Sequence, residues 1–206
     1  MRIGYGWDSH AFQPGVPLKI GGLAFDHPAG LAGHSDGDVL LHAVTDALLG
    51  SVAAGDIGSF FPPGDPRWKN ADSAVFLQTA LEEVQHAGYE IENVDTTLVL
   101  AAPKISPVAE KLRERVAELL AIDPGCVGIK AKTPEGLNQD EVAVAHAVVL
   151  LKKIDNGDVL ERIASAAEPK AEEQEQTRMD DVVRKLVGRR SSVPARKPSF
   201  NTDDIT

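Results

Sequence analysis

Three side chains near the N-terminus have the types and the spacing of a metal site: Asp8, His10 and His42. Asp8 and His10 are two residues apart, and such residues point to the same face of an extended strand. His42 lies in an apolar segment with helical periodicity, where Asp38, His42 and Asp46 recur every four residues and share one face. One carboxylate and two imidazoles leave a coordination position for water or substrate, whereas a structural zinc site usually has four protein ligands. The pattern predicts a metal ion that takes part in chemistry, although each part alone is weak, since a single helical histidine is more often structural.

The composition indicates a soluble, acidic protein with one core. The 206 residues, 43% of them hydrophobic, can bury a substantial core without disulfides. The formal net charge of −10 argues against nucleic-acid binding, because a phosphate backbone attracts a basic surface, but it permits a small anionic substrate. Cys126 is the only cysteine, so an intramolecular disulfide is excluded and the cytoplasm is the expected compartment. We find no signal peptide and no apolar run of about 18 residues, and expect no membrane association.

A strand and a helix have to bring the three ligands together. Residues 2–8 alternate apolar with small or polar side chains, which predicts a half-buried strand that delivers the first two ligands at its end. A short hairpin is expected at 18–25. Ser35 is predicted to cap the helix of the third ligand, because its oxygen-bearing side chain precedes Asp38 by three residues and an apolar periodic run follows.

The rest of the chain continues the alternation of strands and helices. We expect a Gly- and Pro-rich loop at 55–71, a helix at 72–86, a strand at 94–101, a helix that starts at Ser106-Pro107, and strands at 127–132 and 142–151. This order predicts an α/β (α+β) two-layer sandwich, in which helices pack on one face of a mixed β-sheet.

The chain divides into a domain, residues 1–153, and a C-terminal extension, residues 154–206. The extension is polar and contains several prolines, so most of it is expected to be disordered, with a short amphipathic helix at 180–187. A dispensable extension is the favoured interpretation, and a segment that docks a partner is the second.

Four motifs together resemble one family. They are His34-Ser35-Asp36-Gly37-Asp38-x-x-x-His42-x-x-x-Asp46, Asp56-Ile57-Gly58-x-x-Phe61-Pro62, Ala102-Pro103-Lys104 and Lys130-Ala131-Lys132-Thr133-Pro134-Glu135. In this order and spacing they resemble the 2-C-methyl-D-erythritol 2,4-cyclodiphosphate synthase family of the non-mevalonate isoprenoid pathway, and the first motif is highly specific. The resemblance implies a lyase that cyclises 4-diphosphocytidyl-2-C-methyl-D-erythritol 2-phosphate to the 2,4-cyclodiphosphate and releases CMP. Since the attacking phosphate is already anionic, such catalysis depends on positioning and charge neutralisation.

The resemblance also implies roles for single residues. Asp8, His10 and His42 would hold one Zn²⁺ ion at the β-phosphate of the substrate. His34 and Ser35 stand at the expected N-terminus of the first helix, where free backbone amides favour an anion, and would contact the same phosphate. His34 would also stabilise the transition state.

Other residues would surround the remainder of the substrate. By the same resemblance, Asp56 and Gly58 would bind the ribose, Ile57 and Phe61 would face the methylerythritol carbons, and residues 100–106 would hold the cytosine.

Two residues that follow the expected strand at 127–132 would act near the α-phosphate. Thr133 would stabilise that phosphate as a second catalytic residue, and Glu135 would hold a Mg²⁺ or Mn²⁺ ion that bridges the α and β phosphates. Asp46 would support the helix or the ligands rather than bind metal. The implied substrate-binding set is Asp8, Ser9, His10, His34, Ser35, Asp56, Ile57, Gly58, Phe61, Asp65, Leu100, Ala101, Ala102, Pro103, Lys104, Ile105, Ser106, Lys132, Thr133, Pro134 and Glu135.

The chain departs from the family pattern in three places. Lys132 and Pro134 replace two threonines, and Pro63 stands where many members have an acidic residue, with Asp65 nearby. After Leu137 the chain has a shorter segment than the family and lacks the phenylalanine and arginine that line the active-site edge and the trimer channel, so regulation by a channel-bound diphosphate is not expected.

The resemblance further implies a homotrimer with active sites between adjacent subunits. Two other functions stay open: a metal-dependent phosphohydrolase that acts on a nucleotide substrate, and a non-catalytic trimeric scaffold whose extension recruits neighbouring enzymes of the pathway.

Overall fold

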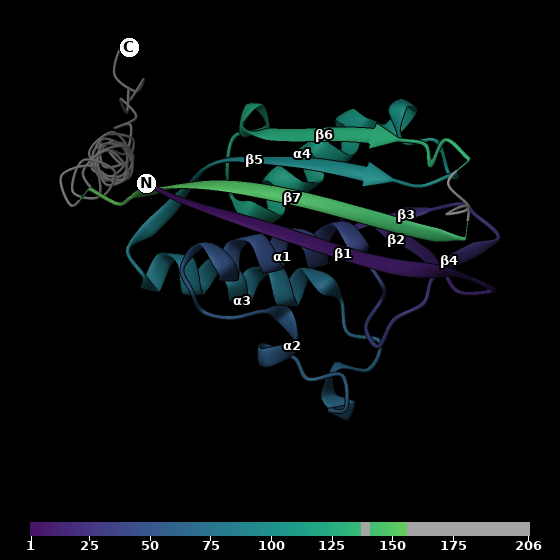
Figure 1. Cartoon of the computed structure of the whole chain (residues 1–206), viewed down its shortest axis with the longest axis horizontal. Helices are drawn as coiled ribbons and strands as arrows, with labels where there is room; N and C mark the ends of the chain where they lie inside the picture. The colour runs from purple at the N-terminus through teal and green to yellow at the C-terminus, as the bar shows by residue number, and fades with distance from the viewer. Residues whose placement is uncertain (137–140, 156–206) are drawn as a thin grey trace, which may run out of the picture. The chain divides into compact units, whose positions relative to one another are not determined.

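A mixed five-stranded sheet forms one layer of the fold. The computed structural model describes residues 1–136 and 141–155. The strand order is β4-β1-β7-β5-β6, and all neighbours are antiparallel except β5 and β6, which are parallel (Figure 1). The mixed sheet that the sequence predicts is therefore confirmed. The strands are β1 (Arg2–Pro14), β4 (Ala29–Leu31), β5 (Tyr89–Val99), β6 (Val127–Lys132) and β7 (Val142–Lys153), with a separate hairpin of β2 (Leu18–Ile20) and β3 (Leu23–Phe25).

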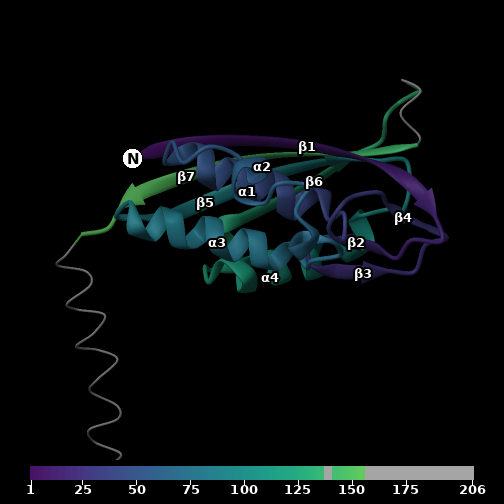
Figure 2. The same ribbon diagram turned by 90° about the horizontal axis from the view of Figure 1, so that it is seen from below.

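Three helices form the second layer and cover one face of the sheet (Figure 2). Their buried side chains, such as Leu40, Leu48, Leu77 and Val116, meet the inward-facing side chains of the sheet in one hydrophobic core. The helices are α1 (Val39–Ser51), α3 (Ser73–His86) and α4 (Ala109–Leu120); the short elements are α2 (Ile57–Phe60) and the 3₁₀ turns η1 (Pro66–Trp68), η2 (Ser106–Val108) and η3 (Pro124–Cys126).

Two glycines let α1 lie directly against β1. A β-carbon on Gly4 would be 1.8 Å from a carbonyl oxygen of α1, and one on Gly6 would be 1.9 Å from another. No side chain fits at these distances, so the backbones of strand and helix touch. The next inward-facing residue of β1 is Asp8, and this close packing brings it within reach of His42 on α1.

The helix α1 begins after Asp38, and the prediction that Ser35 caps it is wrong. The Asp38 carboxylate accepts hydrogen bonds from the amides of Leu41 at 3.1 Å, Gly21 at 2.8 Å and Gly22 at 2.7 Å. The two glycines have positive φ angles of 61° and 75° and make the turn between β2 and β3. Asp38 thus joins the helix to the hairpin, which the sequence alone does not reveal because serine and aspartate are both favourable caps.

Some of the other predicted boundaries agree with the structure and others differ; the strand predicted at 94–101 is β5, which starts at Tyr89 and ends at Val99. The helix α3 follows Asp72 as expected, and β6 matches its predicted range. The strand β1 continues to Pro14 because its second half pairs with β7 and with β4, a short strand that was not predicted. The loop predicted at 55–71 contains α2 and η1, and the third helix starts at Ala109 after a 3₁₀ turn rather than at Ser106.

The predicted helix at 180–187 and the predicted disorder of the extension lie outside the described residues. Among the residues that the structure describes, none of the helices is both long and apolar enough to cross a lipid bilayer.

Candidate metal centre and active site

The structure brings the three predicted ligands together. Asp8 and His10 point from β1 toward the helices, and His42 meets them from α1. The Oδ2 atom of Asp8 lies 3.0 Å from Nε2 of His10 and 2.9 Å from Nδ1 of His42, and the two imidazole nitrogens are 3.0 Å apart. Three donor atoms at such distances can bind one cation.

The charges at this site favour a cation. Burial raises the pKa of the Asp8 carboxyl, but hydrogen bonds with His10 and His42 and their charges outweigh burial and hold the pKa well below its usual range. Burial lowers the pKa of His10, whereas its hydrogen bond with Asp8 and the charge of that carboxylate raise it, and the net direction is upward. An ionised carboxylate with two imidazole nitrogens is a donor set that suits Zn²⁺.

A cavity of about 170 Å³ opens beside these donor atoms. Besides the three ligands, it is lined by five other residues that were predicted to bind substrate and by three residues that were not predicted. Its walls are made by Asp8, His10, His34, Ser35, His42, Ile57, Gly58, Phe61, Pro63, Trp68 and Phe76.

Two of the three unpredicted wall residues, Trp68 and Phe76, are aromatic and lie close to the predicted Phe61. The ring of Phe61 lies 4.3 Å from that of Phe76 on α3 and 4.9 Å from that of Trp68 in η1, measured between centroids. These rings give the cavity an apolar side, and Phe76 also lies beside His42, with 6.0 Å between the ring centroids. The tryptophan was a usable signal, since a large aromatic side chain in a Gly- and Pro-rich loop needs a partner to pack against.

His34 and Ser35 line the cavity, but not at a helix N-terminus as predicted. The helix starts after Asp38, and the carboxylate of Asp38 already accepts a hydrogen bond from the Leu41 amide in its first turn. His34 is exposed and Ser35 is half-buried. At this wall the structure therefore offers the side chains of His34 and Ser35 rather than the N-terminus of α1.

Only one of the three residues that were expected to share a face of α1 reaches the metal centre. Asp38 turns to the β2–β3 hairpin. Asp46 accepts a hydrogen bond from the amide of Ile57 at 2.7 Å and so ties α1 to α2. This contact fits the supporting role expected for Asp46, because α2 forms part of the cavity wall.

Three predicted substrate residues from the first half of the chain, Ser9, Asp56 and Asp65, are absent from the wall of this cavity. The side chain of Ser9 points to the opposite face of the sheet from Asp8, and only its amide contributes, as a donor to Asp8 Oδ1 at 2.8 Å. Asp56 caps α2 through Ser59, and Asp65 binds Arg67, with donor–acceptor distances from 2.6 Å upward in both pairs.

Most of the predicted cytosine and α-phosphate residues gather at a second cavity of about 290 Å³. It lies where the parallel strands β5 and β6 end, and the Leu100 amide donates to the Lys132 carbonyl at 3.1 Å to close the two strand ends together. The Ala102–Pro103 peptide bond is cis. The walls of this cavity are Leu100, Ala101, Pro103, Lys104, Ile105, Ser106, Ala131, Lys132 and Thr133, none of which lines the first cavity.

Ala102, Pro134 and Glu135 are absent from both walls. The Thr133 hydroxyl donates a short hydrogen bond to the carboxylate of Glu135, so these two predicted residues are in contact. Glu135 has a positive φ of 49°, which is uncommon for this residue type.

Comparison with known proteins identifies the family. A model of the YgbB family matches residues 1–152. The chain belongs to the YgbB family. One relative, the 2-C-methyl-D-erythritol 2,4-cyclodiphosphate synthase of Koribacter versatilis (strain Ellin345), is 63% identical over 153 residues, which are 74% of this chain and 99% of the relative.

Solved structures of YgbB-family proteins share the fold. A structure of 2C-methyl-D-erythritol-2,4-cyclodiphosphate synthase has a TM-score of 0.70 at 44% identity, and a form of that synthase bound to CDP has a TM-score of 0.70 at 42% identity. Each comparison covers 73% of this chain and all of the other chain. The family resemblance drawn from the four sequence motifs is confirmed.

Proposed function

We propose that this protein cyclises 4-diphosphocytidyl-2-C-methyl-D-erythritol 2-phosphate to 2-C-methyl-D-erythritol 2,4-cyclodiphosphate and releases CMP, as a lyase of the non-mevalonate pathway. The observation that carries the proposal is the convergence of Asp8, His10 and His42 in a cavity of a chain 63% identical to a synthase of that name. The single cysteine supports a cytoplasmic place of action.

The chemistry asks the protein to bring two anionic groups together. The oxygen of the substrate's own 2-phosphate forms a bond to the β-phosphorus, while the bond from that phosphorus to the bridging oxygen of CMP breaks. The attacking oxygen is already ionised, so no side chain has to remove a proton. The protein therefore positions the two phosphates and offsets their charge.

The residues of the first cavity fit this task. Asp8, His10 and His42 would hold Zn²⁺, which supplies charge neutralisation and polarisation of a phosphate when bound. His34 and Ser35 offer side-chain donors beside the same donor atoms, and the aromatic wall gives the methylerythritol carbons an apolar contact.

The residues of the second cavity fit the nucleotide. Lys104 and Lys132 bring positive charge to its wall, and Thr133 offers a hydroxyl for the α-phosphate. Glu135, in contact with Thr133, would hold the Mg²⁺ or Mn²⁺ ion of the diphosphate. The CDP-bound form of the related synthase supports a cytidine nucleotide as the ligand.

We also propose a homotrimer in which neighbouring chains complete each active site. The two cavities share no lining residue, and we propose that one substrate reaches both across a contact between neighbouring chains. The sheet face that the helices leave uncovered, called here the open face, carries exposed apolar side chains that a neighbour would bury, among them Ile3 (71% exposed) and Trp7 (49%).

The activity is tested by incubating the full-length protein with the diphosphocytidyl substrate, Zn²⁺ and Mg²⁺. We expect release of CMP and a cyclic diphosphate signal in the ³¹P NMR spectrum, both absent for His42→Ala. Linear phosphate products would support a phosphohydrolase instead, and no CMP release above the His42→Ala control would remove the proposal.

Active-site sharing is tested by complementation. We expect His42→Ala and Lys104→Ala to be inactive alone and active when co-expressed, because a mixed trimer contains one junction with both residues intact. Two variants that remain inactive in mixed trimers would contradict shared sites. Recruitment of pathway enzymes by the extension stays a prediction.

A further inference from the structure

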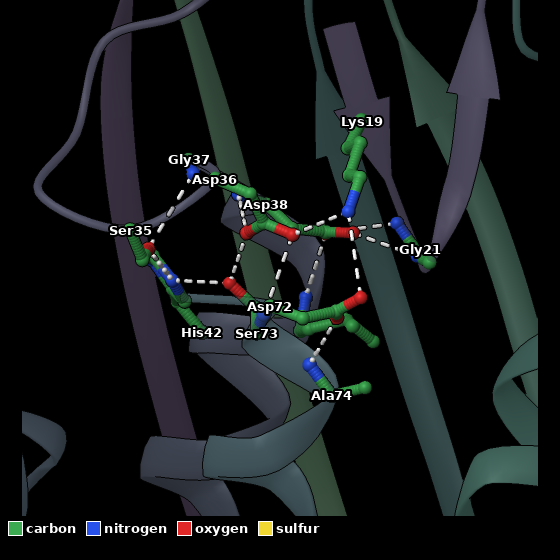
Figure 3. Close-up of polar contacts among 12 residues, drawn as sticks. Lys19, Gly21, Ser35, Asp36, Gly37, Asp38, His42, Asp72, Ser73 and Ala74 are labelled. Carbon is green, nitrogen blue, oxygen red and sulfur yellow. Dashed lines mark hydrogen bonds and ion pairs between the residues drawn. The ribbon is translucent and has the colours of Figure 1, made fainter. Parts of the chain in front are cut away.

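A buried polar network holds the second nitrogen of His42 (Figure 3). Nδ1 of His42 faces Asp8 and His10, whereas Nε2 lies 2.8 Å from the hydroxyl of Ser73 and 3.1 Å from that of Ser35. Ser73 is the first residue of α3 and is fully buried, while Ser35 lines the cavity. The Ser73 hydroxyl is thus the nearer and buried partner of the imidazole, whereas Ser35 lines the cavity, where a ligand can reach it.

Ser73 is connected in turn to Asp36. The Ser73 hydroxyl donates a short hydrogen bond to Oδ1 of Asp36, and the Ser73 amide lies 3.3 Å from Oδ2. The ammonium group of Lys19 donates to the same Oδ2 at 3.1 Å, and the Asp36 side chain is 11% exposed. Lys19 and Asp36 therefore form an ion pair, and Ser73 lies between the Asp36 carboxylate and the His42 imidazole.

The direction of these hydrogen bonds fixes the proton on the imidazole. An ionised carboxylate can only accept hydrogen bonds, so the Ser73 hydroxyl uses its single hydrogen to donate to Asp36. That hydroxyl can then only accept from His42, which means that Nε2 carries the imidazole proton. A neutral imidazole protonated at Nε2 has a free lone pair on Nδ1, the atom that faces Asp8 and His10.

We propose that Ser73 and Asp36 are positioning residues for His42: they orient its ring and keep Nδ1 free to bind the cation. The inference rests on the metal centre of the proposed function and extends it to two residues on separate elements, the segment before α1 and the start of α3. Partners that support histidine ligands in this way typically change metal affinity by about 10- to 100-fold.

The test measures the Zn²⁺ dissociation constant of the full-length protein by competition with a chromophoric chelator. We expect Ser73→Ala to weaken binding by about 10- to 100-fold and Asp36→Asn to weaken it in the same direction. The matched control is Asp72→Asn. Asp72 precedes Ser73, has a side chain that is 57% exposed and also binds Lys19, at 3.4 Å. Among the described residues it makes no contact with His42, so the Zn²⁺ affinity of Asp72→Asn should equal that of the wild type.

Two further readouts separate positioning from a loss of fold. Far-UV circular dichroism of the metal-free proteins should show Ser73→Ala and Asp72→Asn both folded at the assay temperature, although Ser73→Ala should unfold at a lower temperature because it loses buried hydrogen bonds. The visible spectrum of bound Co²⁺ should change only in Ser73→Ala. If the two residues act in series, the double variant Ser73→Ala/Asp36→Asn should bind no more weakly than Ser73→Ala alone.

Unchanged Zn²⁺ affinity in Ser73→Ala, or fully additive losses in the double variant, would overturn the proposal. If Ser73→Ala does not fold, equal affinities of Asp36→Asn and Asp72→Asn would overturn it. A wild-type protein that binds Zn²⁺ no better than His42→Ala would instead refute the metal centre of the proposed function.

Discussion

Gly6 shows how a residue without a side chain shapes the metal centre. The backbone of α1 rests where a β-carbon on Gly6 would be, 1.9 Å from a carbonyl oxygen. We expect Gly6→Ala to destabilise the fold by about 1–3 kcal/mol, because the helix must move away from the strand. Urea unfolding measures this cost, and Zn²⁺ affinity should fall as well, since His42 moves with the helix.

Gly50 provides the control for Gly6 because it lies on α1 itself. A β-carbon there would meet only the Tyr5 carbonyl oxygen, at 4.0 Å. Alanine is favoured over glycine in a helix by about 1 kcal/mol, so Gly50→Ala should be neutral or stabilising. Equal effects of the two substitutions would show that the close contact at Gly6 is unimportant.

The sequence predicts the metal ligands better than their supports. Asp8, His10 and His42 could be found because strand and helix periodicities place them on inward faces. Ser73 and Asp36 could not, since their link to His42 depends on how the start of α3 packs against the segment before α1. A serine at a helix start is ordinarily a cap, and nothing in its spacing indicates a second partner.

Charged contacts between separate elements make the stability of the fold sensitive to acid. Burial raises the pKa of Asp36, but hydrogen bonds from Ser73 and Lys19 lower it more, so the folded-state pKa lies below the unfolded value of about 3.9. The stability from this shift is complete above the unfolded pKa and is lost as the pH falls through the folded one. The free-energy difference between wild type and Asp36→Asn should therefore be constant near neutral pH and shrink below about pH 4.

Urea unfolding of both proteins across this pH range measures that difference. Carboxylates that do not interact with Asp36 affect both proteins alike and cancel in the comparison, whereas the Asp36 charge helps to raise the pKa of buried Asp38, so Asp38 contributes to the difference. A difference that stays the same at acid pH would contradict the stabilising role assigned to Asp36.

Elements with a regular pattern were predictable, and junctions were not. The helix α3 and the strand β6 match because their apolar periodicities end at clear signals, such as Asp72 at the N-cap of α3. The start of α1 was misplaced because the choice between Ser35 and Asp38 is made by the distant amides of the β2–β3 hairpin. The three residues of β4 are too few to show a period and pair only because β1 passes beside them.

At the scale of the whole molecule, the open face predicts assembly. Val148 lies on this face and is 42% exposed, so a charged side chain is tolerated in a single chain but not in a buried contact. We expect Val148→Glu to be monomeric by sedimentation velocity, to retain Zn²⁺ binding and to lose CMP release. Val75→Glu is the control, since Val75 is 49% exposed on α3 in the helix layer. A trimeric, active Val148→Glu protein would exclude the open face as the interface.

The pairing of β1 with β7 places Arg2 opposite Leu151. The start of β1 and the end of β7 therefore lie side by side at one end of the sheet. Arg2 is six residues from Asp8 along β1, or about 20 Å at the usual rise of an extended strand. An affinity tag or a fused enzyme joined at either end would be rooted far from the ligand atoms. Such attachments offer a way to immobilise the protein, or to couple it to a second catalyst, without obstructing the cavity.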